Sequence, residues 1–560
     1  MDNHELNQYT KSTDPLEPKT VATAVDEEAN QSYVTGLKLF SILASVTMAA
    51  FLMLLDGSII GVAISKITSE FHSLDDIGWY MAAYQLASAA LQPLSGKIYT
   101  HISTKWPYLF FFALFKVGSL ICGAAQSSAM LIGGRAIACM GSSGLLNGGM
   151  TIIAGAVPLQ KRPVYTGVYL GISQLGIVSG PLIGGALTEF TTCRWCTCDV
   201  FGFYINLPVG ALVAVGLVFL EVPELVPKAR LSLGLFRKTI PELDLVGFSL
   251  FSTNSVMLLL VLQLGGGGFA WNSPTVINLF WAAGVAAVLF FTWAYKKQDR
   301  AMIPPSIASH RIVWTSAING SMLVASILVA AQYLPIYFQG VRGYGPAMSG
   351  VNTLPEILSQ LLTVILSGAL VPKIGYYLPF AAAGSAISAL RKGLVSTFAP
   401  NTPTHRWVGY QIILGSGRGI GMLMGLIAIQ NVLSAEKTPV GIAFMIFCQN
   451  FAGAVFVVVA EVIFRQQMTR NISRYAPDVS VDAAINAGAS ASSVRGLAPA
   501  GSRTLGGLLL AYANCVNKVF LLLVGLCGVG FVAAFGMGWV DTGSKTVPEK
   551  KKTGDKIAAM

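Results

Sequence analysis

The chain is a succession of apolar runs, each about as long as the hydrocarbon core of a lipid bilayer is thick. A helix needs about 20 residues to cross that core. Only 11% of the 560 residues are charged and 54% are hydrophobic, whereas soluble domains carry about 25% charged residues. The sequence therefore predicts an all-α polytopic membrane protein. The fourteen predicted spans are residues 38–64, 77–99, 106–126, 129–157, 164–188, 203–221, 243–264, 274–296, 312–339, 345–371, 376–398, 406–433, 439–464 and 517–540.

The formal net charge of +11 does not indicate a nucleic-acid partner. The basic residues lie in short loops between apolar runs, and Lys and Arg are concentrated in the loops on the same side as the termini. By the positive-inside rule, both termini are expected in the cytoplasm. The first residues are polar without an apolar core, so we expect no cleaved signal peptide. The sequence favours the cell membrane, and the vacuolar membrane is the alternative.

Two short turns suggest an internal repeat. Gly96–Ser103 follows the second span and Gly368–Gly375 follows the tenth, and each has a glycine, then an apolar residue and then a basic one. If the turns are equivalent, two six-helix bundles flank two linking spans, a recurrent plan in transporters. The predicted regions are a polar cytoplasmic tail (1–36), a first bundle (37–221), a cytoplasmic loop with two linker helices (222–300), a second bundle (301–540) with an extracytoplasmic loop (465–516), and a tail (541–560).

The fifth predicted span contains a file of glycines. Gly176, Gly180 and Gly184 recur every fourth residue, so they share one helix face on which another helix can approach closely. Pro181 removes an internal hydrogen bond and favours a bend. One interpretation is a flexible helix between two moving halves, and the other is ordinary packing of a transmembrane helix. The same file includes Gly171 and Gly185.

Two of the charged residues inside predicted spans are candidates for proton coupling. Asp56 ends an apolar run in the first span, and Arg135 comes early in the fourth. Ionisable groups in lipid are rare and usually functional, and burial raises a carboxyl pKa toward neutrality. Asp56 is therefore a candidate proton carrier, unless it is a wetted carboxylate at the outer end of its helix. Arg135 stays charged and can tune a carboxylate, unless it only snorkels to the interface.

Five segments carry a family resemblance: Leu55–Ile60, Gly133–Ile137, Gly180–Gly185, Trp271–Ser273 and Tyr333–Gln339. Taken in order, they are similar to the fourteen-span drug:proton antiporter branch of the major facilitator superfamily, in the form common in fungi. The resemblance covers roughly residues 36–540. It implies the major facilitator fold and an efflux pump that exports a small organic compound (a toxin, secondary metabolite or drug) while protons run inward. It also assigns Arg135 to proton coupling, and it makes the glycine file a mark of antiporters.

The chain departs from that pattern in four places, one of which is Arg418, where relatives are usually apolar. The turn after the second span has Thr100 and Ser103 where an acid and a glycine are usual. Cys139 stands where a glycine is commoner, and the segment Thr197–Gly202 intervenes where the fifth and sixth spans are usually joined more directly.

Polar and aromatic side chains from several spans are candidates for lining a substrate cavity, although such residues more often pack or anchor a helix at the interface than contact a ligand. Arg418 carries an intramembrane charge, so it favours an anionic cargo if it binds one. Lys116 is a further intramembrane charge, whereas Glu356 and Glu461 lie nearer to span ends, where water can wet their carboxylates. The cavity candidates are Tyr84, Gln85, Tyr333, Gln339, Arg418 and Gln449.

Other motifs point away from catalysis. There is no H-E-x-x-H, no nucleophile elbow and no Walker A sequence, so we expect no enzyme, no cofactor, no metal and no ATP drive. Asn471 begins a glycosylation sequon in the predicted extracytoplasmic loop, and the sequence predicts that it is glycosylated. The alternative is a three-residue match that is not modified. Cys193, Cys196 and Cys198 lack a nearby histidine, so a disulfide or no bond is favoured over zinc.

The sequence thus predicts a monomeric transporter in a lipid bilayer, whose partners are protons and a small-molecule substrate. A proton-linked importer of an iron chelate or nutrient on the same fold, a membrane-embedded enzyme and a non-transporting receptor are the rival interpretations.

Overall fold

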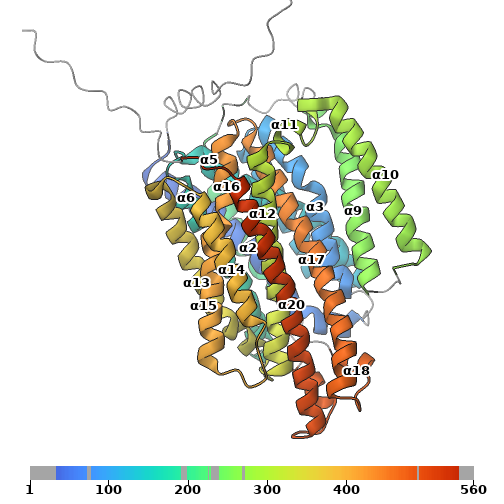
Figure 1. Ribbon diagram of the computed structural model, residues 1–560. Coiled ribbons are helices and arrows are strands. Elements are labelled where there is room, and N and C mark those ends of the chain that lie inside the picture. Colours follow the sequence, from blue (N-terminus) through green and yellow to red (C-terminus); the bar gives the residue numbers. More distant parts are fainter. Residues whose placement is uncertain are drawn as a thin grey trace, which may run out of the picture.

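The computed structural model of the chain describes residues 33–71, 77–190, 198–224, 226, 228, 239–267, 271–487 and 491–541. In this part, fourteen helices of 18 residues or more run up and down beside one another (Figure 1). Ten segments of the described part are long and apolar enough to cross a membrane. The all-α membrane fold is confirmed, and the count of fourteen spans stays a prediction.

The first half contains α2 (Gly36–Phe71), α3 (Ile77–His101), α4 (Lys105–Gly123), α5 (Ser128–Ala156), α6 (Arg162–Phe190) and α7 (Cys198–Phe219). The linker helices are α9 (Leu245–Gly267) and α10 (Pro274–Lys297). The second half contains α12 (Arg311–Ile336), α13 (Pro346–Ile374), α14 (Leu378–Val395), α15 (Thr404–Met422), α16 (Met424–Val432), α17 (Thr438–Tyr475) and α20 (Arg503–Gly536). One apolar core lies within the second half. The other fills the first half and continues into α12, α16 and α17 of the second half.

Glycines set the close packing inside the first half. A Cβ atom on Gly118 of α4 or on Gly141 of α5 would collide with the backbone of the other helix. A Cβ atom on Gly134 would lie 2.8 Å from the sulfur of Cys122. Because a larger residue cannot occupy these positions without moving a helix, α4 and α5 form a rigid pair.

The two halves meet along two pairs of helices. Helix α6 of the first half packs against α13 of the second, and α3 packs against α17. The linker helix α9 lies against both α3 and α17, and α10 lies outside α9, on one side of the bundle (Figure 1). Helix α9 therefore touches both halves, with α10 on its outer side.

The turns that the sequence places on the side of the termini lie at one end of the bundle, here called the terminal end. Thr104 in the α3–α4 turn donates its backbone N–H to Glu224 at 2.7 Å, just beyond α7. The Lys437 ammonium lies 3.7 Å from Asp299, and Asp541 forms a backbone bridge with Tyr376. These contacts hold the terminal end together.

The prediction that residues 465–516 form a loop is wrong, because most of the described residues of this region are helical. Helix α17 continues to Tyr475, α18 (Val481–Asn486) and α19 (Ala491–Gly496) follow, and α20 already begins at Arg503. Polar residues end the apolar run there, but Met468 and Ile472 stay buried against α20 and continue the helix. Hydropathy marks the segment suited to lipid, whereas a helix that packs on a neighbour extends beyond the membrane.

Two further boundaries differ from the prediction. Helix α2 extends to Phe71, beyond the expected end at residue 64. Residues 198–202 of the suspected insertion form the first turn of α7, whereas residue 197 lies outside the described part, as do Cys193 and Cys196.

Candidate functional site

Asp56 and Arg135, predicted from separate spans, form a buried ion pair. The Arg135 Nη1 donates to Asp56 Oδ2 at 3.2 Å, and the hydroxyl of Ser119 donates to Asp56 Oδ1 at 3.1 Å. The two charged side chains are 0% and 1% exposed. A wetted carboxylate and a snorkelling arginine therefore do not describe this arrangement. Because the pair is dehydrated, a proton on Asp56 would remove the main attraction that holds Arg135.

Local sequence explains how these groups meet. Ser127 caps α5 by accepting a hydrogen bond from the Met130 backbone N–H at 3.2 Å, so Arg135 lies two turns inside the helix. Gly134, next to it, allows α5 to approach α4. Ser119 of α4 can then reach the carboxylate that α2 brings from its other side.

A second buried ion pair lies in the other half. Arg418 Nη1 on α15 is bonded to Glu356 Oε1 on α13, and the two side chains are 4% and 7% exposed. The position of Glu356 near a span end suggested a wetted carboxylate, and this interpretation is wrong because the side chain is buried. Gly415, one turn before Arg418, lies directly on the Glu356 carbonyl, so the backbones of α13 and α15 touch at this point.

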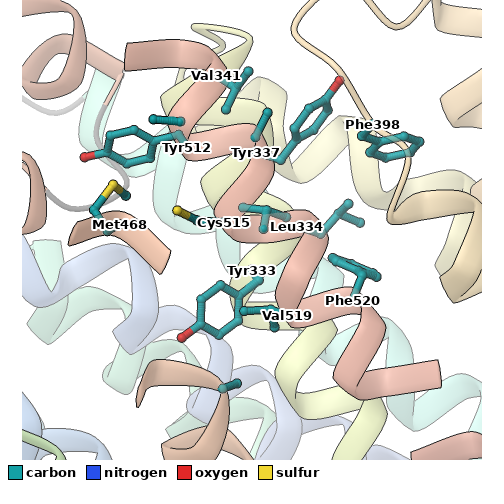
Figure 2. Close-up of a cluster of buried hydrophobic side chains, with 14 of the residues drawn as sticks. Tyr333, Leu334, Tyr337, Val341, Phe398, Met468, Tyr512, Cys515, Val519 and Phe520 are labelled. Carbon is teal, nitrogen blue, oxygen red and sulfur yellow. The ribbon is translucent and has the colours of Figure 1, made fainter. Parts of the chain in front are cut away.

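The remaining cavity candidates are dispersed. Tyr333 is 2% exposed and packs within an apolar cluster with Leu334 and Phe520 (Figure 2). Gln449 lies beside Gly320 between α17 and α12, because a Cβ atom on that glycine would be 2.8 Å from its Nε2. Gln339 is half-buried in the π-helical turn Tyr337–Val341. The side chains of Tyr84 and Gln85 lie outside the described part.

The glycine file of α6 serves two neighbours rather than one. A Cβ atom on Gly171 would lie 2.6 Å from Leu361 Cδ1 of α13, across the interface between the halves. A Cβ atom on Gly176 would lie 2.5 Å from the Phe51 carbonyl of α2, within the first half. Gly180 is buried in α6, and the surroundings of Pro181, Gly184 and Gly185 lie outside the described part.

The two repeated turns make equivalent contacts across the halves. A Cβ atom on Gly96 of α3 would lie 2.7 Å from Ala443 Cβ and 3.1 Å from the Pro439 carbonyl of α17. A Cβ atom on Gly368 of α13 would lie 2.5 Å from the Pro163 carbonyl of α6. The repeat identified these positions, but only the structure shows that both glycines close the terminal end.

Two acids bind backbone groups at the terminal end, and one of them contacts the α3–α4 turn, where the usual acid is missing. Glu224 accepts hydrogen bonds from the backbone N–H and the hydroxyl of Thr104 at 2.7 and 2.8 Å, and Lys228 lies 3.3 Å from Glu224. Asp244, at the start of α9, accepts from Trp293 Nε1 and from the Met302 N–H, both at 2.8 Å. Local sequence patterns do not predict the hydrogen bonds of these two acids, because their partners are far away in the chain.

The sequon asparagine is engaged by the protein itself. Asn471 lies inside α17, where its side-chain amide donates to Cys515 Sγ of α20 at 3.4 Å. A sugar on that nitrogen would require this contact to break, so glycosylation of Asn471 stays a prediction that the geometry does not favour.

The family of the chain follows from its similarity to known proteins. A model of the Major Facilitator Superfamily matches residues 46–457. The chain belongs to the Major Facilitator Superfamily. It is therefore a multi-pass membrane transporter and not a member of an enzyme family.

Curated relatives match nearly the whole length. The chain is 70% identical over 535 residues to the MFS-type transporter calB of Penicillium decumbens, covering 96% of this chain and 93% of that protein. It is 45% identical over 534 residues to the efflux pump mlcE of Penicillium citrinum, covering 93% and 95%. Among solved structures, the inward-facing, unoccupied crystal structure of a bacterial homolog of the human lysosomal transporter Spinster has a TM-score of 0.55 at 14% identity, covering 90% of this chain and 98% of that one. This last likeness concerns the fold alone.

Proposed function

We propose that this transporter exports a small organic compound, such as a toxin, secondary metabolite or drug, while protons run inward. The observation that carries the proposal is the buried Asp56–Arg135 pair. It is supported by a relative named an efflux pump that shares 45% of its residues with this chain. The two halves alternate between openings by rocking along the α6–α13 and α3–α17 seams.

Asp56 is the proton carrier in this proposal. Ionised, it is held by Arg135 and Ser119. Protonated, it no longer compensates the arginine, so the arrangement of α2 against α5 loses its main electrostatic restraint. Asp56 lies 20 residues beyond the start of α2, or about 30 Å along the helix axis. It is therefore remote from the terminal end, where the glycine contacts close the halves.

The proposed setting is the cell membrane, with both termini in the cytoplasm, the protein working as a monomer and no cofactor bound. Asp56 then lies toward the outer face, from which protons enter. The vacuolar membrane is the alternative site. Fusing a fluorescent reporter to each terminus and testing its sensitivity to external protease decides both the membrane and the orientation.

Transport by the purified protein in sealed vesicles tests the proposal. An imposed pH difference should drive accumulation of the exported compound, and a protonophore should stop it. Undiminished accumulation after the pH difference is dissipated would contradict proton coupling. A deletion strain should retain more of the compound than its parent, and retention of less compound would favour an importer of an iron chelate or nutrient.

A further inference from the structure

The guanidinium of Arg418 is only partly used by the protein. Its Nη1 is bonded to Glu356, whereas its Nε and Nη2 have no hydrogen-bond partner among the described residues. The side chain is 4% exposed. The Nε and Nη2 atoms form one edge of the guanidinium, and two parallel N–H groups on such an edge match the two oxygens of a carboxylate. Donors left without a partner in a buried position are unfavourable, so this edge is suited to an incoming acceptor.

A second buried cation lies close by. Lys392 on α14 is 0% exposed, and its ammonium donates to the sulfur of Cys527 on α20 at 3.1 Å. A thiol is a weak acceptor and carries no compensating charge. Gly417, adjacent to Arg418, packs on Ser388, which lies one turn before Lys392. Helices α14 and α15 thus bring two basic side chains to one region of the second half.

The carboxylates on spanning helices do not offset these charges. Asp56, Glu356 and Glu461 are the carboxylates whose side chains the structure describes on those helices, and each is bonded to an arginine. Lys392 has no carboxylate partner in the described part. A cationic cargo would therefore find its acidic partners already engaged there, whereas an anionic cargo would meet a positive surplus.

We propose that the transported compound carries a carboxylate or a similar organic anion, and that the Nε–Nη2 edge of Arg418 binds this group. Lys392 adds positive charge behind the site. The inference rests on the proposed function, since it names the class of compound exported. Access follows from the helices involved: α13, which holds Glu356, is also the helix that α6 contacts across the halves. Rocking that separates α6 from α13 opens the contact between α13 and α15 to the space between the halves, from which a ligand can enter.

Binding to the purified full chain in detergent tests this class. Three fluorescent probes share one pyrene: 1-pyrenebutyrate, its primary amide, and a pyrenebutyl trimethylammonium. We expect the carboxylate probe to bind about 10-fold more tightly than the other two, by fluorescence anisotropy. Arg418→Gln should remove the preference and Arg418→Lys should retain part of it. Arg465→Gln, an exposed arginine on α17 that also pairs with a glutamate, is the matched control and should leave the preference intact.

A second variant keeps the test decisive if Arg418→Gln does not fold. Glu356→Gln frees the whole guanidinium, so it should raise affinity for the carboxylate probe several-fold and leave the amide unchanged. Equal affinities for the three probes, no binding of any of them, a preference for the cation, or an unchanged affinity in Glu356→Gln would each overturn the proposal. The measurement needs no proton gradient, so its failure leaves proton-driven export to be judged separately.

Discussion

The arginines of the two buried ion pairs lie on equivalent helices of the two halves, but the pairs differ in where the acid comes from and in what surrounds them. Arg135 and Arg418 lie on α5 and α15, each the fourth spanning helix of its half, at positions 8 and 15 of those helices. Arg418 thus lies about 10 Å farther along its helix. Asp56 is enclosed by an arginine and a serine hydroxyl, whereas Arg418 keeps two donors without a partner in the described part. Both carboxylate oxygens of the first pair accept a hydrogen bond, whereas the arginine of the second pair has a two-donor edge with no partner in the described part.

This difference supports different proposed roles for the two halves. A carboxylate fully satisfied by its own half can respond to a proton without a ligand, so the first pair suits a switch between facing states. An arginine with a vacant edge responds to a ligand, so the second suits recognition. The predictions below separate these roles.

The largest effect is expected from Asp56→Asn. The amide cannot take up a proton and offers Arg135 no negative charge, so gradient-driven transport should fall by about 100-fold or more. Glu356→Gln, the matched carboxylate-to-amide change in the other half, should keep its dependence on the pH gradient. Initial rates in vesicles with and without a protonophore, normalised to protein in the membrane, measure both. Equal loss of gradient dependence in the two variants would erase the distinction between the pairs.

The next effect concerns movement of one half against the other. Gly171→Leu inserts a side chain between α6 and α13, so transport should fall by about 10-fold or more while each half stays folded. Gly176→Leu inserts the same side chain between α6 and α2 of one half, and overpacking there should lower the free energy of unfolding by about 1–3 kcal/mol. Gly180→Leu should block turnover and leave membrane insertion intact. Transport rates and thermal unfolding of the three purified variants would be compared.

The opposite result would contradict this assignment of the two glycines. If Gly171→Leu unfolded the protein and Gly176→Leu merely slowed transport, Gly176 rather than Gly171 would lie at the interface that moves during transport. Normal transport by Gly180→Leu would remove the functional meaning of the glycine file.

A double-mutant cycle compares the strengths of the two pairs. Combining Asp56→Asn with Arg135→Gln should recover about 1–3 kcal/mol of the stability lost in the single variants, because neither charge is then left alone. Glu356→Gln with Arg418→Gln should recover less, since Arg418 already has donors without a partner. Unfolding in detergent measures both cycles, and a larger coupling in the second pair would contradict this ranking.

Much of the architecture follows from the sequence, because apolar runs of membrane length specify spanning helices and the repeated glycine turns mark two halves. Intramembrane charge also singled out Asp56, Arg135 and Arg418. What could not be predicted is pairing between remote positions. Glu356 and Arg418 are separated by 61 residues in the sequence, and nothing in either run announces the other. A helix has several faces, so the glycine file alone does not show that Gly171 contacts α13 whereas Gly176 contacts α2.

Segments outside the lipid were predicted least well. The region 465–516 was expected to be a loop because its hydropathy falls, yet buried Met468 and Ile472 continue α17. The acid absent from the α3–α4 turn was noticed in the sequence as a departure. Its replacement by Glu224 required the chain to return after α7, which local patterns do not encode.

The smallest effect tests this replacement at the terminal end. Burial lowers the pKa of Lys228 below its usual 10.5, and the neighbouring Glu224 raises it partway back. Between its folded and unfolded pKa values, the unfolded chain binds more protons, so stability rises with pH in that window. Glu224→Gln removes the opposing influence, lowers the folded pKa further and widens the window. Each further unit by which the pKa of Lys228 in the folded protein is lowered reduces the free energy of unfolding at neutral pH by about 1.4 kcal/mol.

The variant should therefore be less stable than the parent at pH 7 and should regain part of the difference as the pH approaches 10.5. Thermal unfolding in detergent at pH 7 and pH 10 measures the change. Glu221→Gln, an exposed acid paired with Lys38 at the start of α2, is the matched control and should show no such recovery. A constant deficit of Glu224→Gln at both pH values would mean that Glu224 acts through its hydrogen bonds to Thr104 alone. The first half would then rely on a cap to fix its terminal turn, while the second relies on the Tyr376–Asp541 bridge.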